Sequence, residues 1–217
     1  MELKACIFDA SGVLIDDVNA IYTTSNKILE ESNIPPVSFE DFQSRTKIPF
    51  WEYYKSFGLT EGESKATDTH FRKLYPQYTD LVKLYPEVRD VLEVLKSKGI
   101  KMGIVTHLPT FAISQNLDSF GVKEFFDSVV AFEDTDEHKP SAKPLLIALS
   151  KLNVEPSNAI FVGDMIQDIL TGRRAGVKTV AVIREKNPYQ TKEKLLEYNP
   201  DYIISNLSEI FDTGVFR

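Results

Sequence analysis

Cysteine is almost absent from this chain of 217 residues, which has a single one, Cys6. One cysteine excludes an intrachain disulfide and any zinc cluster built from cysteines. Because Cys6 lies inside the apolar run Ala5–Phe8, we expect it to be a small buried core residue. The histidines, His70, His107 and His138, are too dispersed in the sequence to show the spacing of a zinc site.

Long apolar runs and basic runs are also missing. No segment approaches the ~20 apolar residues that a membrane-spanning helix needs. The first residues, Met1–Lys4, lack the apolar stretch and cleavage site of a signal peptide. The formal net charge is −7, which argues against nucleic acid and anionic lipid as partners. We therefore expect a cytoplasmic protein that binds neither nucleic acid nor membranes.

What the chain does have is a regular alternation of short apolar runs with helical patterns, which predicts an α/β fold with a parallel sheet covered by helices. The apolar runs are continuous, as expected of strands that are buried on both faces. The predicted strands are Lys4–Asp9, Lys101–Thr106, Ser128–Ala131, Ala159–Val162, Thr179–Ile183 and Asp201–Ile204. The predicted helices between them are Glu87–Lys98, Thr110–Phe120, Ser141–Leu152, Ile166–Ala175 and Lys192–Glu197.

One stretch, from about Asp16 to Lys83, breaks this alternation and predicts an inserted helical cap. We expect residues 1–15 and 85–217 to form the α/β core and residues 16–84 to form the cap, placed over the carboxyl ends of the strands as a lid. Ser38 followed by Asp41, and Thr60 followed by Glu63, are typical of helix starts. The helical patterns are Asp17–Glu31, Phe39–Gln43 continuing into Phe50–Phe57, and Glu61–Leu84.

Acidic residues follow two of the predicted strands. Asp9 ends the first, and Asp164 and Asp168 lie four residues apart at the start of a predicted helix, so that one helix face carries both. Each of them alone would more often cap a turn or a helix than bind a ligand. Together they suit Mg²⁺, which prefers oxygen ligands and takes one or two carboxylates beside a substrate phosphate.

Groups suited to a phosphate follow other strands and loops. The hydroxyl of Thr106 and the amide of His107 come at the end of a strand, where they are able to bind phosphate oxygens. The amides of Ser11 and Gly12, directly after Asp9, are able to do the same. Lys139 is a candidate compensating cation for a pocket that holds carboxylates and a phosphate.

In combination, these segments resemble the four motifs of the haloacid dehalogenase superfamily, in particular its small phosphatases with a helical cap after the first strand. The resemblance covers essentially the whole chain and rests on the order and spacing of the motifs. It implies a Rossmann-like three-layer parallel-sheet core with an inserted helical cap. The segments are Ile7–Asp16, Ile104–Thr106, Lys139–Pro140 and Val162–Ile169 continuing to Val177.

The resemblance implies a covalent mechanism on a small phosphorylated metabolite. Asp9 would attack phosphorus and become an aspartyl-phosphate, which water then hydrolyses. Mg²⁺ would be held by the Asp9 carboxylate, the Ser11 carbonyl and Asp164, with Asp168 binding it through water. Thr106 and Lys139 would hold the phosphoryl group.

The chain departs from the family at Ser11, where phosphatases of this kind have an aspartate that protonates the leaving oxygen and then activates water. A serine hydroxyl cannot replace that acid and base near neutral pH, which puts a factor of roughly 10²–10⁴ in rate at risk. The backbone carbonyl at this position remains available to the metal.

Several functions stay compatible with this departure. One is a phosphatase that is slow or acts on good leaving groups such as acyl phosphates, which we favour. Another is carbon–phosphorus cleavage of the phosphonoacetaldehyde hydrolase kind, with Lys47 or Lys55 of the cap as the amine. A third is a regulator that binds phosphorylated ligands without turnover. In the cap, Arg45 and Lys47 are candidates to read a second anionic group, and the chain would act as a monomer or a homodimer.

Overall fold

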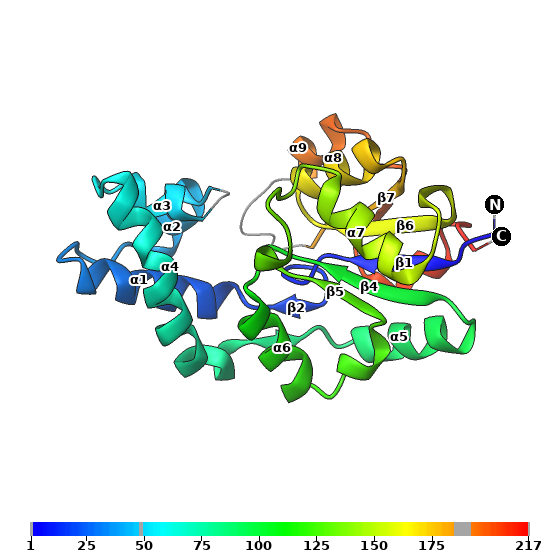
Figure 1. Ribbon diagram of the computed structural model, residues 1–217, viewed down its shortest axis with the longest axis horizontal. Coiled ribbons are helices and arrows are strands. Elements are labelled where there is room, and N and C mark those ends of the chain that lie inside the picture. Colours follow the sequence, from blue (N-terminus) through cyan, green and yellow to red (C-terminus); the bar gives the residue numbers. More distant parts are fainter. Residues whose placement is uncertain (1, 48–49, 185–191, 217) are drawn as a thin grey trace. The chain divides into compact units, whose positions relative to one another are not determined.

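The computed structural model describes residues 2–47, 50–184 and 192–216. The chain divides into two compact units (Figure 1). The first, here called the sheet unit, comprises Met1–Asp16 and Leu84–Arg217; the second, the helical unit, is Asp17–Lys83. No helix of the described residues is both long enough and apolar enough to cross a membrane.

A sheet of six parallel strands forms the centre of the sheet unit, in the order β5-β4-β1-β6-β7-β8. The predicted parallel α/β fold is thereby confirmed, and each predicted strand is present within a residue or two of its expected ends. The middle strands are fully buried because helices cover both faces of the sheet. The strands are β1 (Ala5–Phe8), β4 (Lys101–Val105), β5 (Ser128–Val130), β6 (Ala159–Gly163), β7 (Lys178–Val182) and β8 (Tyr202–Ile204).

Helices on the two faces of this sheet make it a three-layer structure. On one face, α7 and α8 pack on the strands, and Ile7 and Phe161 meet Leu145 and Leu149 in the main apolar cluster. The ribbon shows α5 and α6 on the other face (Figure 1). The helices are α5 (Val88–Ser97), α6 (Thr110–Ser119), α7 (Lys143–Leu152), α8 (Ile166–Ala175) and α9 (Lys192–Glu197), with short 3₁₀ helices at Lys123–Phe125, Phe132–Asp134, Pro156–Asn158 and Leu207–Phe211.

The strand register brings the ends of three strands to one level. Phe8 of β1 is paired with Ile104 of β4 on one side and with Val162 of β6 on the other. The residues that follow these strands therefore leave the same edge of the sheet, since parallel strands share their carboxyl ends. The backbone N–H of Asp9 continues the ladder by donating to the Val162 carbonyl at 2.8 Å.

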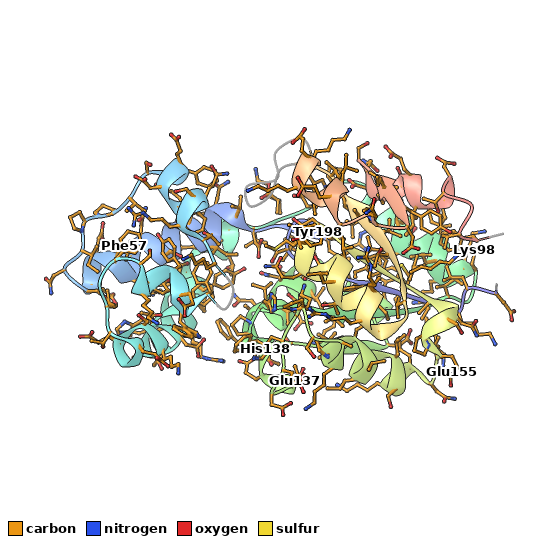
Figure 2. All side chains as sticks on the ribbon, turned by 90° about the horizontal axis from the view of Figure 1, so that it is seen from above. Phe57, Lys98, Glu137, His138, Glu155 and Tyr198 are labelled. Carbon is orange, nitrogen blue, oxygen red and sulfur yellow. The ribbon has the colours of Figure 1, made fainter. Side chains whose placement is uncertain are left out.

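The helical unit is built around aromatic side chains. Phe42 and Tyr53 are fully buried, and their rings meet edge to face with centroids 5.5 Å apart. Tyr53 also contacts Phe57, which Figure 2 labels in this unit. The elements are α1 (Val18–Glu31), α2 (Phe39–Arg45), α3 (Trp51–Lys55), α4 (Glu61–Leu74) and the 3₁₀ helix η1 (Tyr75–Leu81).

Both predicted helix starts in this unit are confirmed, whereas two predicted continuations are wrong. Ser38 accepts from the Asp41 amide, and Thr60 and Glu63 form a capping box. The predicted helix from Phe39 does not continue, because α2 stops at Arg45 and Thr46 is extended. Residues 48 and 49, which the predicted continuation includes, lie outside the described residues. The last α-helix stops at Leu74, since Pro76 has no N–H for the next α-helical hydrogen bond.

The chain passes between the units through short extended segments that the sequence pattern did not predict. β2 (Ile15–Asp16) and β3 (Lys83–Leu84) form a two-stranded sheet, and the Tyr85 amide donates to the Leu14 carbonyl at 3.1 Å. A strand of two residues is too short to show an alternation in the sequence.

Candidate active site at the carboxyl edge of the sheet

A buried lysine joins two of the predicted acidic residues. The ammonium nitrogen of Lys139 lies 2.9 Å from Oδ1 of Asp9 and 2.7 Å from Oδ1 of Asp168. Each of these three side chains exposes 6% or less of its surface. The remaining oxygen of Asp168 accepts from the Met165 amide at 3.0 Å, which fixes this carboxylate at the first turn of α8.

Asp164 completes an acidic cluster with Asp9 and Asp168. Carboxylate oxygens of these residues lie within 4.8 Å of one another, and all three residues are buried. The Asp9 carboxylate is held by the Ala10 amide, which donates to Oδ1 at 2.8 Å. The structure thus brings together four of the predicted site residues, which come from the end of β1, the loop before α7, the turn after β6 and the first turn of α8.

Glycine is required where the loop after Asp9 approaches Asp164. A Cβ atom at Gly12 would lie only 2.2 Å from Oδ2 of Asp164, and the φ angle of Gly12 is +76°. Both conditions exclude any other residue without movement of the loop. A Cβ at Gly163 would likewise lie 2.2 Å from the Asp168 side chain. These contacts keep the main chain close to the carboxylates.

The electrostatics of the cluster are unbalanced in favour of negative charge. Burial, partly offset by Lys139, raises the pKa of Asp9 to about 6. Burial, together with Asp9 and Asp168, raises the pKa of Asp164 well above its ordinary value. For Lys139, burial alone would lower the pKa, but the Asp168 and Asp9 carboxylates raise it above that of a free lysine. One ammonium therefore faces three carboxylates.

This donor set fits a hard divalent cation. Magnesium and calcium prefer oxygen ligands, and a cation beside Asp9 and Asp164 would restore the charged form that burial disfavours. Because Gly12 has no Cβ, its main chain lies close to the Asp164 carboxylate, so main-chain and carboxylate oxygens come together at this point. Among the described residues this is the one group of three or more acidic, histidine or cysteine side chains close enough to hold a metal.

The remaining predicted residues of the sheet unit lie at the same edge. Thr106 is buried directly after β4, and its hydroxyl accepts from the Leu108 amide at 3.1 Å. His107 follows Thr106, and burial lowers the pKa of its ring well below the ordinary value. Ser11 is half-buried, and its main chain forms an isolated β-bridge with Ile15 within the loop after β1.

Two of the histidines that are dispersed in the sequence are close in space. The ring centroids of His107 and His138 are 6.4 Å apart, and His138, labelled in Figure 2, stacks on Phe132 at 3.9 Å. Because His138 directly precedes Lys139, this contact places the turn after β4 beside the loop that carries the lysine.

The candidate residues of the helical unit are exposed and are held by contacts inside that unit. The guanidinium of Arg45 lies over the Phe57 ring at 4.9 Å. Lys47 is exposed, whereas Lys55 lies 3.8 Å from Glu52 and over the Trp51 ring.

Two arginines near the site were given no role by the sequence. Arg174, which lies in the fourth motif-like segment, donates from α8 to the Pro140 carbonyl at 2.7 Å and so links α8 to the loop that carries Lys139. Arg184, just beyond β7, donates to the carbonyls of Gly12 and Val13. Arg184 lies in none of the four motif-like segments, so only the folded chain reveals its contacts.

Comparison with known proteins identifies the family. The model of haloacid dehalogenase-like hydrolases matches residues 6–182, which include the strands and turns that carry the acidic cluster. The chain therefore belongs to the haloacid dehalogenase-like hydrolases, as the four motifs predicted, and is a hydrolase.

Individual relatives match over almost the full length. The chain is 32% identical to a pyrophosphatase PpaX from Bacillus velezensis, over 98% of this chain and 97% of the relative. It is 27% identical to a phosphoglycolate phosphatase from Haemophilus influenzae, over 96% and 97%. A solved haloacid dehalogenase-like hydrolase from Streptococcus pneumoniae has the same fold, with a TM-score of 0.84, 23% identity and 97% coverage of each chain.

Proposed function

We propose that the chain is a magnesium-dependent phosphohydrolase that forms an aspartyl-phosphate at Asp9. The observation that carries this proposal is the buried contact of Asp9 with Lys139, 2.9 Å apart, beside the Asp164 carboxylate. A carboxylate held next to a fixed ammonium is oriented for attack on an electrophile that is itself negatively charged. The similarity to enzymes named as a pyrophosphatase and a phosphatase supports phosphorus as that electrophile.

The reaction has two displacements. An oxygen of Asp9 forms a bond to phosphorus while the bond to the leaving oxygen breaks, and the bonding electrons depart with the leaving group. Water then attacks the same phosphorus, releases phosphate and a proton, and regenerates the Asp9 carboxylate. Lys139 and the hydroxyl of Thr106 would hold the phosphoryl oxygens, together with the amides of Ser11 and His107. The Gly12 amide, which was also expected to bind phosphate, donates to the Ile15 carbonyl at 2.8 Å instead.

Magnesium, when bound, supplies positive charge to the phosphoryl oxygens and offsets the repulsion between the phosphate and the acidic cluster. Asp9, Asp164 and the Ser11 carbonyl would hold it, with Asp168 acting through water. The helical unit would serve as a cap that contacts the substrate, with Arg45 and Lys47 as candidate contacts.

Ser11 narrows the substrate class. The loop after Asp9 has no acid at this position, so a poor leaving group such as an alkoxide would depart without a proton donor there. A phosphate or carboxylate leaving group is stable as an anion near neutral pH and needs no such donor. We therefore propose phosphoanhydrides, with pyrophosphate first, or acyl phosphates as the preferred substrates.

The test compares leaving groups in wild type and in Ser11→Asp, with Ser11→Ala as the matched control. We expect wild type to hydrolyse pyrophosphate or acetyl phosphate with Mg²⁺ and to lose this activity in EDTA. Ser11→Asp should raise the rate on alkyl phosphates by roughly 10²–10⁴ and change the pyrophosphate rate much less. Ser11→Ala should leave both rates near wild type.

Two results would count against the proposal. Equal gains of Ser11→Asp on all substrates would show that leaving-group protonation does not set the preference. No phosphate release from any anhydride, acyl phosphate or ester in the presence of magnesium would favour a ligand-binding regulator instead.

A further inference from the structure

Arg184 lies just beyond β7 and is largely buried, with 12% of its side chain exposed. Its Nη2 donates to the Val13 carbonyl at 3.0 Å, and its Nε lies 3.4 Å from the Gly12 carbonyl. A guanidinium that bridges two successive carbonyls fixes the direction of that stretch of main chain, because its donors form a rigid fork. The stretch in question is the loop that follows Asp9.

The opposite side of this loop faces the acidic cluster. Gly12 approaches Asp164 so closely that a Cβ atom would overlap its carboxylate. The amide of Gly12 donates to the Ile15 carbonyl at 2.8 Å, which closes the turn. The Gly12–Val13 main chain is thus held between Arg184 and Asp164, and Ser11, with its proposed metal-binding carbonyl, directly precedes it.

The guanidinium of Arg184 is also held by residues outside the loop. Its Nη1 lies 2.6 Å from Oε1 of Glu87, and that oxygen also accepts from the Leu207 amide at 3.3 Å. The guanidinium lies over the Tyr85 ring, 3.8 Å from its centroid. A carboxylate, a ring and the loop carbonyls therefore fix the fork on several sides.

We propose that Arg184 is a positioning residue for the magnesium site: it sets the place of the Ser11–Gly12 main chain relative to Asp164 and thereby the affinity for the metal. It does so through the loop backbone and does not touch the substrate. The proposal rests on the proposed function only in assuming that magnesium binds beside Asp9 and Asp164. Residues that orient metal ligands without binding the metal commonly change its affinity by roughly 10- to 100-fold.

Arg89 provides a matched control. Its Nη2 donates to the successive carbonyls of Phe120 and Gly121 at the C-terminal end of α6, so it makes the same kind of contact elsewhere in the sheet unit. Arg184→Gln and Arg89→Gln each remove an arginine that binds two successive carbonyls; Arg184→Gln also removes the partner of Glu87, so its loss in thermal stability in EDTA should be the larger. A merely structural role of Arg184 would leave the Mg²⁺ affinity of both variants equal to that of wild type.

The decisive measurement is Mg²⁺ binding by calorimetry, without substrate. We expect Arg184→Gln to raise the Kd for Mg²⁺ by roughly 10- to 100-fold and Arg89→Gln to leave it within about twofold of wild type. Arg184→Lys, which keeps one charge but loses the fork, should fall between them. In turnover, the magnesium concentration needed for half activity should shift in parallel, whereas KM for pyrophosphate at saturating magnesium should change little.

The outcomes separate this inference from the proposed function. If wild type binds magnesium and hydrolyses pyrophosphate, equal Mg²⁺ affinities of Arg184→Gln and Arg89→Gln would overturn only the role of Arg184. A wild type that binds no magnesium would overturn both. If Arg184→Gln does not fold, Glu87→Gln replaces it: a Kd raised severalfold supports the proposal, and an unchanged Kd contradicts it.

Discussion

The two units bury polar groups in different ways. In the helical unit, the buried hydroxyls of Thr24 and Ser25 bond to their own helix: Thr24 donates to the Ala20 carbonyl and Ser25 to the Ile21 carbonyl, both at 2.7 Å. In the sheet unit, the buried Asp9 and Lys139 are paired across distant segments, and the Asp164 carboxylate lies beside those of Asp9 and Asp168. Locally satisfied hydroxyls are neutral to the fold and chemically inert, whereas a buried excess of carboxylates is costly and remains available to a ligand. The buried hydroxyls of the helical unit are thus part of its packing, whereas the buried charges of the sheet unit are available for chemistry.

The largest expected effect breaks the buried ion pairs. Lys139→Met leaves two buried carboxylates without their ammonium, and we expect a loss of about 3–5 kcal/mol in the free energy of unfolding. Phosphohydrolase activity should fall below detection. Thr24→Val in the helical unit removes one locally bonded hydroxyl and should cost about 1 kcal/mol. Urea unfolding in EDTA at pH 7.5 measures both; equal losses would mean that the two kinds of burial do not differ energetically.

A smaller effect concerns pH. Because the pKa of Asp9 is raised from 3.8 to about 6 in the folded state, the metal-free protein binds more protons folded than unfolded. The contribution of Asp9 to the stability of the metal-free protein is therefore greatest below about pH 4. It is lost as the pH rises through about 6. Asp9→Asn does not titrate at this position.

The stability of Asp9→Asn relative to wild type should thus increase between pH 4 and pH 7, by on the order of 2–3 kcal/mol. Denaturant unfolding of the two proteins in EDTA measures the difference at each pH. Magnesium should reduce it at pH 7, since the cation stabilises the ionised carboxylate. A difference that is flat with pH would contradict the raised pKa.

The smallest effect is expected in the helical unit. Arg45→Ala combined with Lys47→Ala removes two exposed cations, so stability should stay within about 0.5 kcal/mol of wild type. If these cations contact substrate, KM should rise up to about tenfold, equivalent to about 1.4 kcal/mol, with kcat little changed. Arg72→Ala, which removes an exposed partner of Asp68, is the control. Steady-state kinetics that show no difference between the two variants would exclude the candidate contacts.

The sheet could be predicted because its signals are local. Each strand is a continuous apolar run between turns, and α8 begins and ends where its residues indicate. The capping box of Thr60 and Glu63 is likewise contained within four residues. The acidic cluster was predicted from Asp9, Asp164 and Asp168 because parallel strands end at one edge, so that order along the chain is enough to bring them together.

What could not be predicted depends on contacts between distant segments. The contacts of Arg184 with Glu87 and the Gly12–Val13 carbonyls join three places in the chain, and none of them has a distinctive pattern. The paired β2 and β3 are too short to show a period. The end of α4 before Pro76 was missed because an apolar pattern continues past a residue that cannot continue the hydrogen bonds.

The central place of β1 has a consequence for folding. One of its two neighbours in the sheet, β6, comes from the last third of the sequence, so the carboxylates meet only after β6 has docked on β1. A fragment that lacks β6 has no acidic cluster for a cation. Tight binding of Mg²⁺ would therefore report that the first and the late part of the chain have come together in one sheet.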